Sequence, residues 1–360
     1  MPEPVLSTRA LNRAILARQL LLERADLGLR DALERVAGLQ AQYAPSAYIG
    51  LWSRLQSFRR ADLTAALEQR HAIQATLMRA TIHVVSAGDF PPLAAAVRRA
   101  RREWWQRVTR SRGLAEEELP ALAETVRAAL AAGPRRRAEL VAALEQAGYH
   151  KDVWEAVALV VDLIRVPPSG TWEHRRADLY GLAADWLEPH EALDPDAGQS
   201  EAVERAGLTH LIARYLRAFG PASAGDLASW SGVPVSRLRP VLQDMDLRRF
   251  RDEGGGALLD VPDGLLPDPR TPAPVRFLPT WDATLLVHAR RTGLLPEAHR
   301  PRVFSTRNPH STPTFLVDGA VAGTWRAQDG QVRLEPFGDL RPADRAALEH
   351  EGEALAAFHA

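Results

Sequence analysis

An internal repeat constrains the fold of this chain more than any other feature of its sequence. Residues 60–69 match residues 137–146 at eight of ten positions. A third copy is indicated at Gly220-Pro221. This pair precedes Asp226-Leu227 by the same number of residues by which Gly133-Pro134 precedes Glu139-Leu140 in the second copy. Self-similarity of this kind is typical of tandem structural modules.

Each copy of the repeat leads into a helical pattern and then into a polar or strand-like tail. Residues 76–85 alternate closely enough to predict a strand after the first copy. The tail of the second copy covers 166–172 and 177–180, and that of the third covers 250–259 with its three consecutive glycines. Helices followed by a hairpin wing make a winged helix, so three tandem winged-helix modules are the simplest account. Such modules bind nucleic acid, although some dock proteins instead.

Helical periodicity dominates the first part of the chain, and strand patterns replace it after about residue 271. The predicted helices of the first module cover 8–24, with Ser7 as the N-cap, then 30–39, 48–56 and 61–69. The predicted strands of the C-terminal part cover 275–282, 284–288, 314–317, 321–326 and 331–335. Asp318-Gly319 is a strong hairpin-turn signal, and a last helix is predicted over 342–357.

The sequence therefore predicts a mainly α fold with β structure, in four consecutive parts. Winged-helix modules are expected at 1–112, 113–190 and 200–270, and a small β-domain with a terminal helix at 271–360. The acidic stretch 188–204 is rich in Asp, Pro and Gly, which predicts a linker between the second and third modules.

Composition excludes several kinds of site. The chain of 360 residues is 46% hydrophobic, enough for a folded globular protein, and it contains no cysteine. Disulfides, thiolate nucleophiles and zinc-thiolate sites are therefore excluded, and the eleven histidines show no metal-ligand spacing. We expect no metal and no other cofactor. The first residues lack the pattern of a secretory signal and no window is apolar enough for a membrane span, which predicts a cytoplasmic protein.

The net charge of zero hides a basic first third. Residues 1–112 contain eighteen arginines and no lysine against nine acidic residues, so the rest of the chain must be acidic. The densest part is 98–112, with seven arginines and the pair Trp104-Trp105. Arginines interleaved with aromatic rings suit phosphate contacts and base stacking. The other interpretation, held equally open, is a solvated helix face with the tryptophans in the core.

Two glutamines in the segment 39–52 form the candidate catalytic pair. Gln40 and Gln42 stand two residues apart, and Pro45 disfavours helix at Ala44, so the preceding helix should end near here. Where the chain is extended or turning, side chains at i and i+2 share a face, and both amides would then face one cleft. Carboxamides neither take nor give a proton at neutral pH, so a site built on them must act on a bond that is already activated.

Short motifs along nearly the whole chain resemble the winged-helix DNA glycosylases of the AlkZ and YcaQ type. They are Leu39-Gln40-Ala41-Gln42 with Ser46-Ala47-Tyr48 and Leu51-Trp52, then Met78-Arg79-Ala80-Thr81-Ile82-His83, then Phe219-Gly220-Pro221 with Asp226-Leu227, then Leu278-Pro279-Thr280-Trp281-Asp282 with Leu285-Leu286, and then Leu316-Val317-Asp318-Gly319 with Gly323-Thr324-Trp325. In that family Gln-x-Gln marks the branch of the azinomycin-resistance enzyme and Gln-x-Asp marks the YcaQ branch. Because Gln42 stands where the YcaQ branch has Asp, the resemblance is to the Gln-x-Gln branch of the azinomycin-resistance enzyme.

The resemblance implies a C-shaped protein around a channel for duplex DNA, which hydrolyses the N-glycosidic bond of cationic alkylated purines. N7-alkylguanine, N3-alkylpurines and bulky natural-product adducts or interstrand crosslinks are the expected lesions, in DNA repair or antibiotic self-resistance. Gln40 and Gln42 would be catalytic. We expect a monofunctional enzyme, because the only lysine, Lys151, lies in the second module. The expected partner is double-stranded DNA carrying such purines, bound by a nucleoid-associated monomer.

The expected DNA contacts come from three parts of the chain. Arg79, Thr81 and His83 alternate along the predicted first wing strand and would share one face. For His83, a hydrogen-bonded, half-buried core histidine is an equally open interpretation. The full set is Tyr43, Ser46, Arg59, Arg60, Arg79, Thr81, His83, Arg302, Arg307 and His310. Two other functions stay open: a transcription regulator that binds DNA without catalysis, and a protein-docking scaffold.

Overall fold

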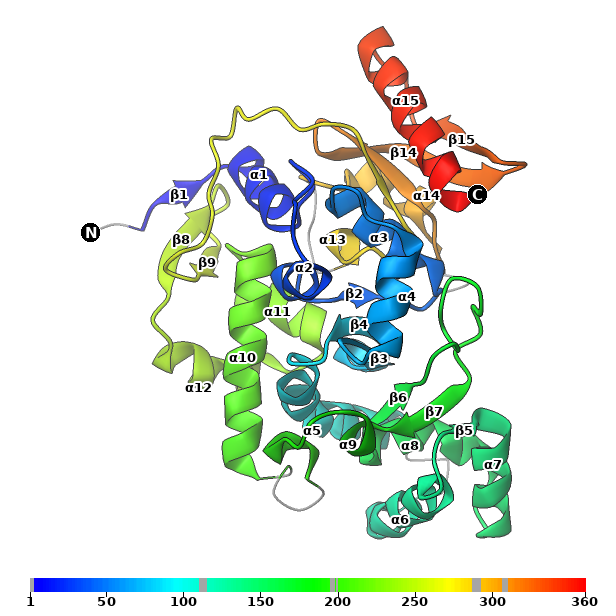
Figure 1. The fold of residues 1–360 in the computed structure, drawn as a ribbon. Coiled ribbons are helices and arrows are strands. Elements are labelled where there is room, and N and C mark those ends of the chain that lie inside the picture. The colour runs from blue at the N-terminus through cyan, green and yellow to red at the C-terminus, as the bar shows by residue number, and fades with distance from the viewer. Residues whose placement is uncertain (1–2, 110–114, 195–197, 199, 287–292, 306–309) are drawn as a thin grey trace. The chain divides into compact units, whose positions relative to one another are not determined.

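The protein has a mixed α/β fold, described by a computed structural model (Figure 1). The described residues are 3–109, 115–194, 198, 200–286, 293–305 and 310–360. Their contacts divide the chain into two compact units. We call residues 1–63, 213–230 and 246–360 the first unit, and residues 64–212 and 231–245 the second unit.

The first unit combines the N-terminal helices with the C-terminal strands. Its helices are α1 (Thr8–Arg18), α2 (Leu29–Arg35), α3 (Pro45–Arg54), the start of α4 (Arg60–Glu68), the end of α10 (Glu201–Phe219), α11 (Ala224–Ser231), α13 (Ala283–Leu286), α14 (Arg300–Val303) and α15 (Pro342–His359). Its strands are β1 (Val5–Leu6), β2 (Leu39–Gln40), β8 (Arg248–Asp252), β9 (Ala257–Asp260), β10 (Arg276–Leu278), β11 (Phe304–Ser305), β12 (His310–Ser311), β13 (Thr314–Val317), β14 (Ala320–Gln328) and β15 (Gln331–Pro336). An antiparallel sheet in the order β10-β13-β14-β15 dominates the C-terminal part.

The second unit is built on antiparallel strands in the order β4-β3-β6-β7-β5. These strands are β3 (Ala72–Thr76), β4 (Ile82–Ser86), β5 (Arg135–Arg136), β6 (Leu163–Arg165) and β7 (Leu179–Leu182). Its helices are the end of α4, α5 (Phe90–Thr109), α6 (Leu119–Leu130), α7 (Arg137–Gln146), α8 (Trp154–Val160), α9 (Ala183–Trp186), the start of α10 and α12 (Val235–Asp244).

The three copies of the repeat have the same local structure. Each contains a helix, α4, α7 or α11, and an antiparallel strand pair follows it in the chain, β3–β4, β6–β7 or β8–β9. In each copy the acidic side chain three residues into the repeat accepts a hydrogen bond from the backbone N–H that precedes the helix. The bonds run from Arg59 to Asp62 (2.8 Å), from Arg136 to Glu139 (2.8 Å) and from Ser223 to Asp226 (3.1 Å). The repeat is thus a helix-start signal used three times.

The strand predicted over 76–85 is wrong, because the chain reverses there. β3 and β4 pair from Ala72 opposite Ser86 to Thr76 opposite Ile82, and 77–81 form the turn between them. Arg79 (φ 53°) and Ala80 (φ 56°) have left-handed backbones that no strand contains. Arg79, Thr81 and His83 therefore do not alternate along one strand.

Most of the predicted C-terminal strands and the last helix are confirmed, but the strand predicted over 275–282 is shortened to β10 and one other strand is absent from the described residues. Asp318 (φ 46°) and Gly319 (φ 80°) form the turn between β13 and β14, as a two-residue hairpin requires. The strand predicted over 284–288 is wrong: α13 covers Ala283–Leu286, and 287–288 lie outside the described residues. The Asp282 carboxylate accepts the backbone N–H of Thr284 at 3.0 Å, which starts a helix here.

Several helices end earlier than their apolar patterns predict. Ser7 caps α1 as expected, but the helix stops at Arg18, where Leu20 turns left-handed (φ 58°) and the Leu21 N–H bonds Leu16 O at 2.7 Å. α2 stops at Arg35, and Ala37 and Gly38 both have positive φ. The expected linker 188–204 is partly structured, since α10 begins at Glu201.

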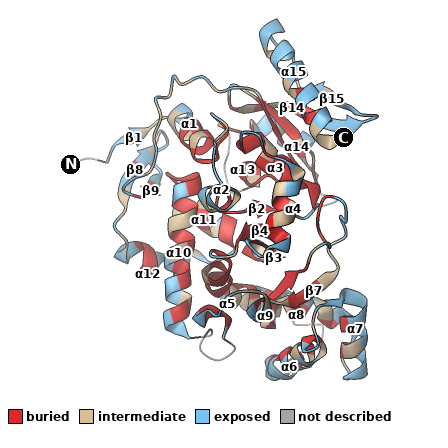
Figure 2. Cartoon of the chain, viewed as in Figure 1, coloured by how far each residue is buried: buried red, intermediate tan, exposed pale blue. Residues whose placement is uncertain are grey.

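Burial is uneven between elements (Figure 2). β3 is buried along almost its whole length, whereas α15 buries only Leu348, Gly352 and Leu355. No helix among the described residues is long and apolar enough to cross a membrane.

Candidate active site

The glutamine pair lies on a short strand and a bend, at the point where α3 begins. Gln40 is the last residue of β2 and is only 6% exposed, while Gln42 is exposed in the following bend. Pro45 is the first residue of α3, a position that suits its fixed φ and its missing N–H. The sequence predicts a helix end near this proline, whereas the structure has a helix start there.

A buried charge network anchors α3 at its other end. Arg54 binds Asp282 through two parallel hydrogen bonds of 2.9 Å, and both side chains are fully buried. Burial alone raises the pKa of the Asp282 carboxyl, but the charge of Arg54 and hydrogen bonds from Arg54 and Thr284 outweigh it and hold the pKa below its ordinary value. Arg54 also donates to Gln19, whose amide bonds the backbone O of Val36 at 3.2 Å, shortly before β2.

A cavity of about 320 Å³ opens beside the start of α3, within the first unit. Of the motif segment, Tyr43 (44% exposed) and Ser46 line it, and the Ser46 hydroxyl bonds the Thr280 hydroxyl at 2.8 Å. The wall is otherwise made by Ile49, Pro279, Thr312, Pro313, Thr324, Trp325, Arg326, Ala327, Glu335 and His359. Sequence reasoning missed Thr280 and Glu335 as wall residues, although Thr280 lies inside the motif 278–282.

The wall offers one carboxylate that belongs to an ion pair. Glu335 lies 2.6 Å from Arg326, and both side chains are about half exposed. Within the described part of the chain, no group of three or more His, Asp or Glu side chains is placed to hold a metal ion.

The hairpin residues lie in the second unit. Arg79 is part of the turn, and the His83 Nδ1 lies 3.0 Å from the backbone O of Thr81. Burial and the nearby charge of Arg79 lower the pKa of His83 to about 3, although the Thr81 bond opposes this. His83 is therefore a neutral, buried, hydrogen-bonded histidine. Burial also lowers the pKa of Arg79 to about 10, so this arginine remains charged at neutral pH.

The other expected DNA contacts lie at several places in the first unit. Arg59 pairs with Asp62 at 3.0 Å and is exposed, and Arg60 donates to the backbone O of His359 at 3.3 Å. The Arg302 guanidinium stacks 3.9 Å from the centre of the Phe337 ring. Arg307 lies outside the described residues, as does the side chain of His310 at the start of β12.

The arginine-rich stretch of α5 has one tryptophan in the core and one on the surface, and several of its arginines form ion pairs. Trp105 is buried and Trp104 is 49% exposed. Arg98 binds Asp162 at 2.5 Å, and Arg99 binds Glu103 at 3.1 Å. Residues 110–112 lie outside the described residues. Much of the positive charge of this helix is therefore compensated within the protein.

Several residues of the recognised motifs have structural roles. A side chain at Gly323 would meet the Phe315 ring at 2.3 Å and the backbone O of Glu335 at 2.6 Å, so only glycine fits. The Trp325 indole donates to the backbone O of Leu278 at 3.0 Å. These motif residues hold the C-terminal sheet together.

Comparison with known proteins now gives the family. The model of the family described as "DNA glycosylase AlkZ-like" matches residues 33–358. The solved structure of the Streptomyces sahachiroi DNA glycosylase AlkZ is similar with a TM-score of 0.78 at 20% sequence identity, over 99% of this chain and 96% of that one. A search of the curated proteins gave no match. Because the family model spans most of its length, the chain belongs to the AlkZ-like family of DNA glycosylases.

Proposed function

We propose that this DNA glycosylase hydrolyses the N-glycosidic bond of cationic alkylated purines and that Gln40 and Gln42 are its catalytic pair. The observation that carries the proposal is the placement of two neutral amides on one short segment. Gln40 is buried at the end of β2, and the exposed Gln42 follows it just before α3. The Arg54–Asp282 pair and Gln19 fix the elements on either side of this segment.

Neutral amides suffice for this reaction because the leaving group arrives charged. A purine alkylated at N7 or N3 is cationic, so its glycosidic bond breaks toward an oxocarbenium-like sugar without protonation of the base. What remains is to orient a water molecule toward the anomeric carbon and to place oxygen dipoles beside the developing positive charge. A carboxamide oxygen does both. The bond to a normal, uncharged purine is not activated in this way, so such purines should be retained.

The DNA-binding part of the proposal rests on the basic N-terminal third and on the repeated helix–hairpin pattern. We assign the three repeats to winged-helix modules that hold duplex DNA in a channel, with the protein acting as a nucleoid-associated monomer. Tyr43 and Ser46, which follow the amide pair in the chain, line the cavity of the first unit, whose wall does not include Gln40 or Gln42. Arg59 and Arg302 are exposed cations suited to backbone phosphates.

The test is single-turnover release of N7-methylguanine from a duplex oligonucleotide, scored as alkali-labile abasic sites. Replacing both glutamines (Gln40→Ala, Gln42→Ala) should slow release about 100-fold, the usual effect of removing preorganised dipoles, with DNA affinity unchanged. Gln56→Ala is the matched control, because Gln56 is an exposed glutamine of the same unit that bonds the Arg24 backbone. Unchanged release in the double variant would refute the assignment and favour a non-catalytic DNA-binding role.

Two further arms separate the rival chemistries. If Glu335→Gln slows release as much as the double glutamine variant, the carboxylate in the cavity wall carries the charge stabilisation instead. Release of unmodified adenine or guanine at the rate of N7-methylguanine would remove the argument from lesion charge. Duplexes carrying N3-methyladenine, a bulky N7 adduct or an interstrand crosslink then define the natural lesion, and with it a role in repair or in antibiotic self-resistance.

A further inference from the structure

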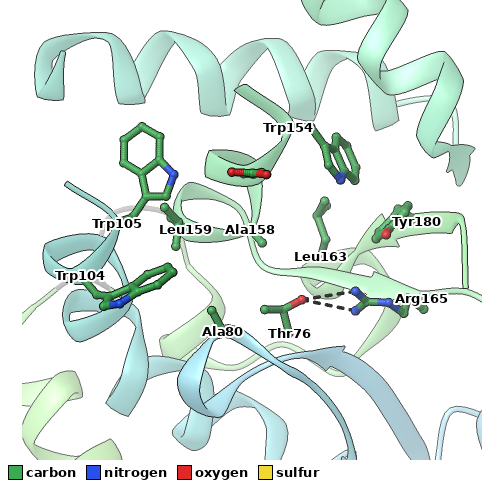
Figure 3. A pocket seen from close by; sticks show the side chains of 11 residues that line it. Thr76, Ala80, Trp104, Trp105, Trp154, Ala158, Leu159, Leu163, Arg165 and Tyr180 are labelled. Carbon is green, nitrogen blue, oxygen red and sulfur yellow. Dashed lines mark hydrogen bonds between the residues drawn. The ribbon is translucent and has the colours of Figure 1, made fainter. Parts of the chain in front are cut away.

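The second unit contains a cavity of about 520 Å³ that the glutamine chemistry does not use (Figure 3). It lies between α5, α8, the end of β3, and the strands β6 and β7. Its wall consists of Thr76, Ala80, Trp104, Trp105, Trp154, Glu155, Ala158, Leu159, Leu163, Arg165 and Tyr180. A volume of this size is in the usual range for small-molecule sites, which run from about 300 to 1,000 Å³.

Aromatic rings form two walls of this cavity. Figure 3 shows Trp104 and Trp105 at one end, and Trp154 and Tyr180 at the other. The Trp154 and Tyr180 rings meet edge to face with centroids 5.1 Å apart, so their positions are mutually fixed. Trp104 is 49% exposed, an unusual state for a large apolar ring. Planar ligands stack on such faces.

Arg165 supplies a buried cation that has no carboxylate partner among the described residues. Its side chain is 8% exposed, and both Nη atoms lie 3.4 Å from the Thr76 hydroxyl. The Tyr180 hydroxyl is its other hydrogen-bond partner, and the guanidinium lies 5.4 Å from the centre of the Tyr180 ring. Burial lowers the pKa of Arg165, yet an arginine stays protonated. A buried charge is normally paired, so this one is placed to meet an anion from outside the chain.

We propose that this cavity binds a nucleotide, with the base stacked on the tryptophans and the phosphate on Arg165. A guanidinium binds phosphate oxygens through two parallel hydrogen bonds, and an aromatic wall accepts any base. Every base of the DNA on which this family acts carries a phosphate, so base and anion arrive together. Glu155, the carboxylate of the wall, would accept hydrogen bonds from the N–H groups of guanine.

The site explains why the tryptophan pair lies in an arginine-rich helix whose own arginines are largely paired with acids. Trp104 and Trp105 come from α5, whereas the cation, for which the described residues offer no carboxylate, comes from β6. The proposal is independent of the glutamine assignment, because all its wall residues belong to the second unit. Two sources share the ligand chemistry: a free nucleotide, and an unpaired nucleotide within a DNA strand.

Isothermal titration calorimetry of the full chain with 2′-deoxyguanosine 5′-monophosphate tests the site. We expect binding that weakens about tenfold in Arg165→Gln and in Trp104→Ala, in line with the loss of a charged hydrogen bond or one stacking face. Deoxyguanosine and inorganic phosphate alone should each bind more weakly than the nucleotide. Arg70→Gln is the matched control, because Arg70 is an exposed arginine of the same unit stacked on Trp186. Its affinity for the nucleotide should equal that of the unsubstituted protein.

A second pair of titrations separates the two sources. Binding of a single-stranded oligonucleotide that loses affinity in Arg165→Gln, with no binding of the free nucleotide, assigns the site to an unpaired nucleotide of the strand. Three results overturn the proposal. The first is equal nucleotide affinity in Arg165→Gln and in the unsubstituted protein, and the second is binding of benzoate as tight as that of the nucleotide. The third is that neither the free nucleotide nor the single-stranded oligonucleotide binds. The release of N7-methylguanine, measured in parallel, reports on the glutamine pair separately.

Discussion

Arg54 and Arg165 are both buried arginines, one in each unit, and they differ in what they meet. Arg54 donates to a carboxylate, to two hydroxyl or amide oxygens and to a backbone oxygen, although its Nε has no hydrogen-bond partner among the described residues. Arg165 meets the hydroxyls of Thr76 and Tyr180 and the Tyr180 ring, with no carboxylate partner among the described residues, and it borders a cavity of about 520 Å³. A buried charge paired with an opposite charge is a structural element, while one that meets neutral groups and borders a cavity is a candidate binding group.

The same distinction applies to other recognised motifs. Arg18 and Asp260 form a second fully buried pair, at 2.7 Å, and a side chain at Gly220 would meet both of them within 3 Å. The motif around Gly220 is thus explained by packing against a charge pair. Motif residues of this kind report on the fold of the family and say little about its chemistry.

Breaking the first pair should give the largest effect. Arg54→Met leaves the Asp282 carboxylate buried without its cation, which typically costs about 3–5 kcal/mol of the free energy of unfolding. Urea denaturation followed by circular dichroism measures this. The double variant Arg54→Met with Asp282→Leu should recover most of the loss, because two apolar side chains leave no charge behind. A double variant as unstable as the single one would mean that packing, and not the unpaired charge, is responsible.

His83 should give an intermediate effect that depends on pH. Its folded pKa of about 3 lies below the ordinary 6.5, so between these values the unfolded chain binds a proton that the folded chain does not. The free energy of unfolding therefore falls by about 1.4 kcal/mol for each pH unit of acidification in this window. In His83→Gln that contribution is absent, and the dependence on pH should be shallower between pH 6.5 and 4, where denaturation curves of both proteins are compared.

Two comparisons isolate the His83 effect. His150→Gln is the control for replacing a histidine of the same unit, because the His150 side chain is 74% exposed. The lowered pKa of Asp282 acts in a separate window: its stabilisation is present above the ordinary value of 3.8 and is lost as the pH falls below it. Identical slopes for His83→Gln and the unsubstituted protein would show that His83 is not buried in its neutral form.

The carboxylates of Asp226 and Glu139, which accept backbone N–H groups at the starts of two repeat helices, are less buried than Arg54 and should contribute less to stability. Asp226→Ala removes the acceptor for the Ser223 N–H and hydroxyl, while Ser223 caps Asp226 in return at 3.1 Å. Loss of such a reciprocal cap should cost about 1 kcal/mol, measured as a lower urea midpoint. Glu139→Ala removes a single acceptor from an exposed position and should cost less. A larger loss in Glu139→Ala would contradict the reciprocal cap as the cause.

The sequence predicts local structure well where the signal is local. Ser7 predicted the start of α1, and Asp318-Gly319 predicted the turn between β13 and β14. The strand over 76–85 was wrong because alternation continues through a turn whose positive φ angles fall on Arg79 and Ala80, residues that give no turn signal. Their conformation is imposed by the pairing of β3 with β4, which a single sequence does not reveal.

The candidate sites follow the same division. Gln40 and Gln42 were identified because two amides beside a proline form a local pattern. Thr280 and Asp282 are recognisable from the sequence only as part of a motif, because their partners Ser46 and Arg54 are more than two hundred residues away in the chain. Arg165 gave no sequence signal at all, since nothing local distinguishes an arginine with a carboxylate partner from one without.

Arg165→Met should give the smallest change in stability and so provides the sharpest contrast with Arg54→Met. No carboxylate among the described residues pairs with Arg165, so its removal leaves no buried negative charge without a partner. The substitution also removes the cost of desolvating the guanidinium, while methionine fills a similar volume. The free energy of unfolding should therefore stay within about 1 kcal/mol of its original value or rise, as measured by urea denaturation. A decrease in the free energy of unfolding as large as that of Arg54→Met would mean that groups of the protein itself stabilise this cation. The cavity would then not be expected to bind an anion.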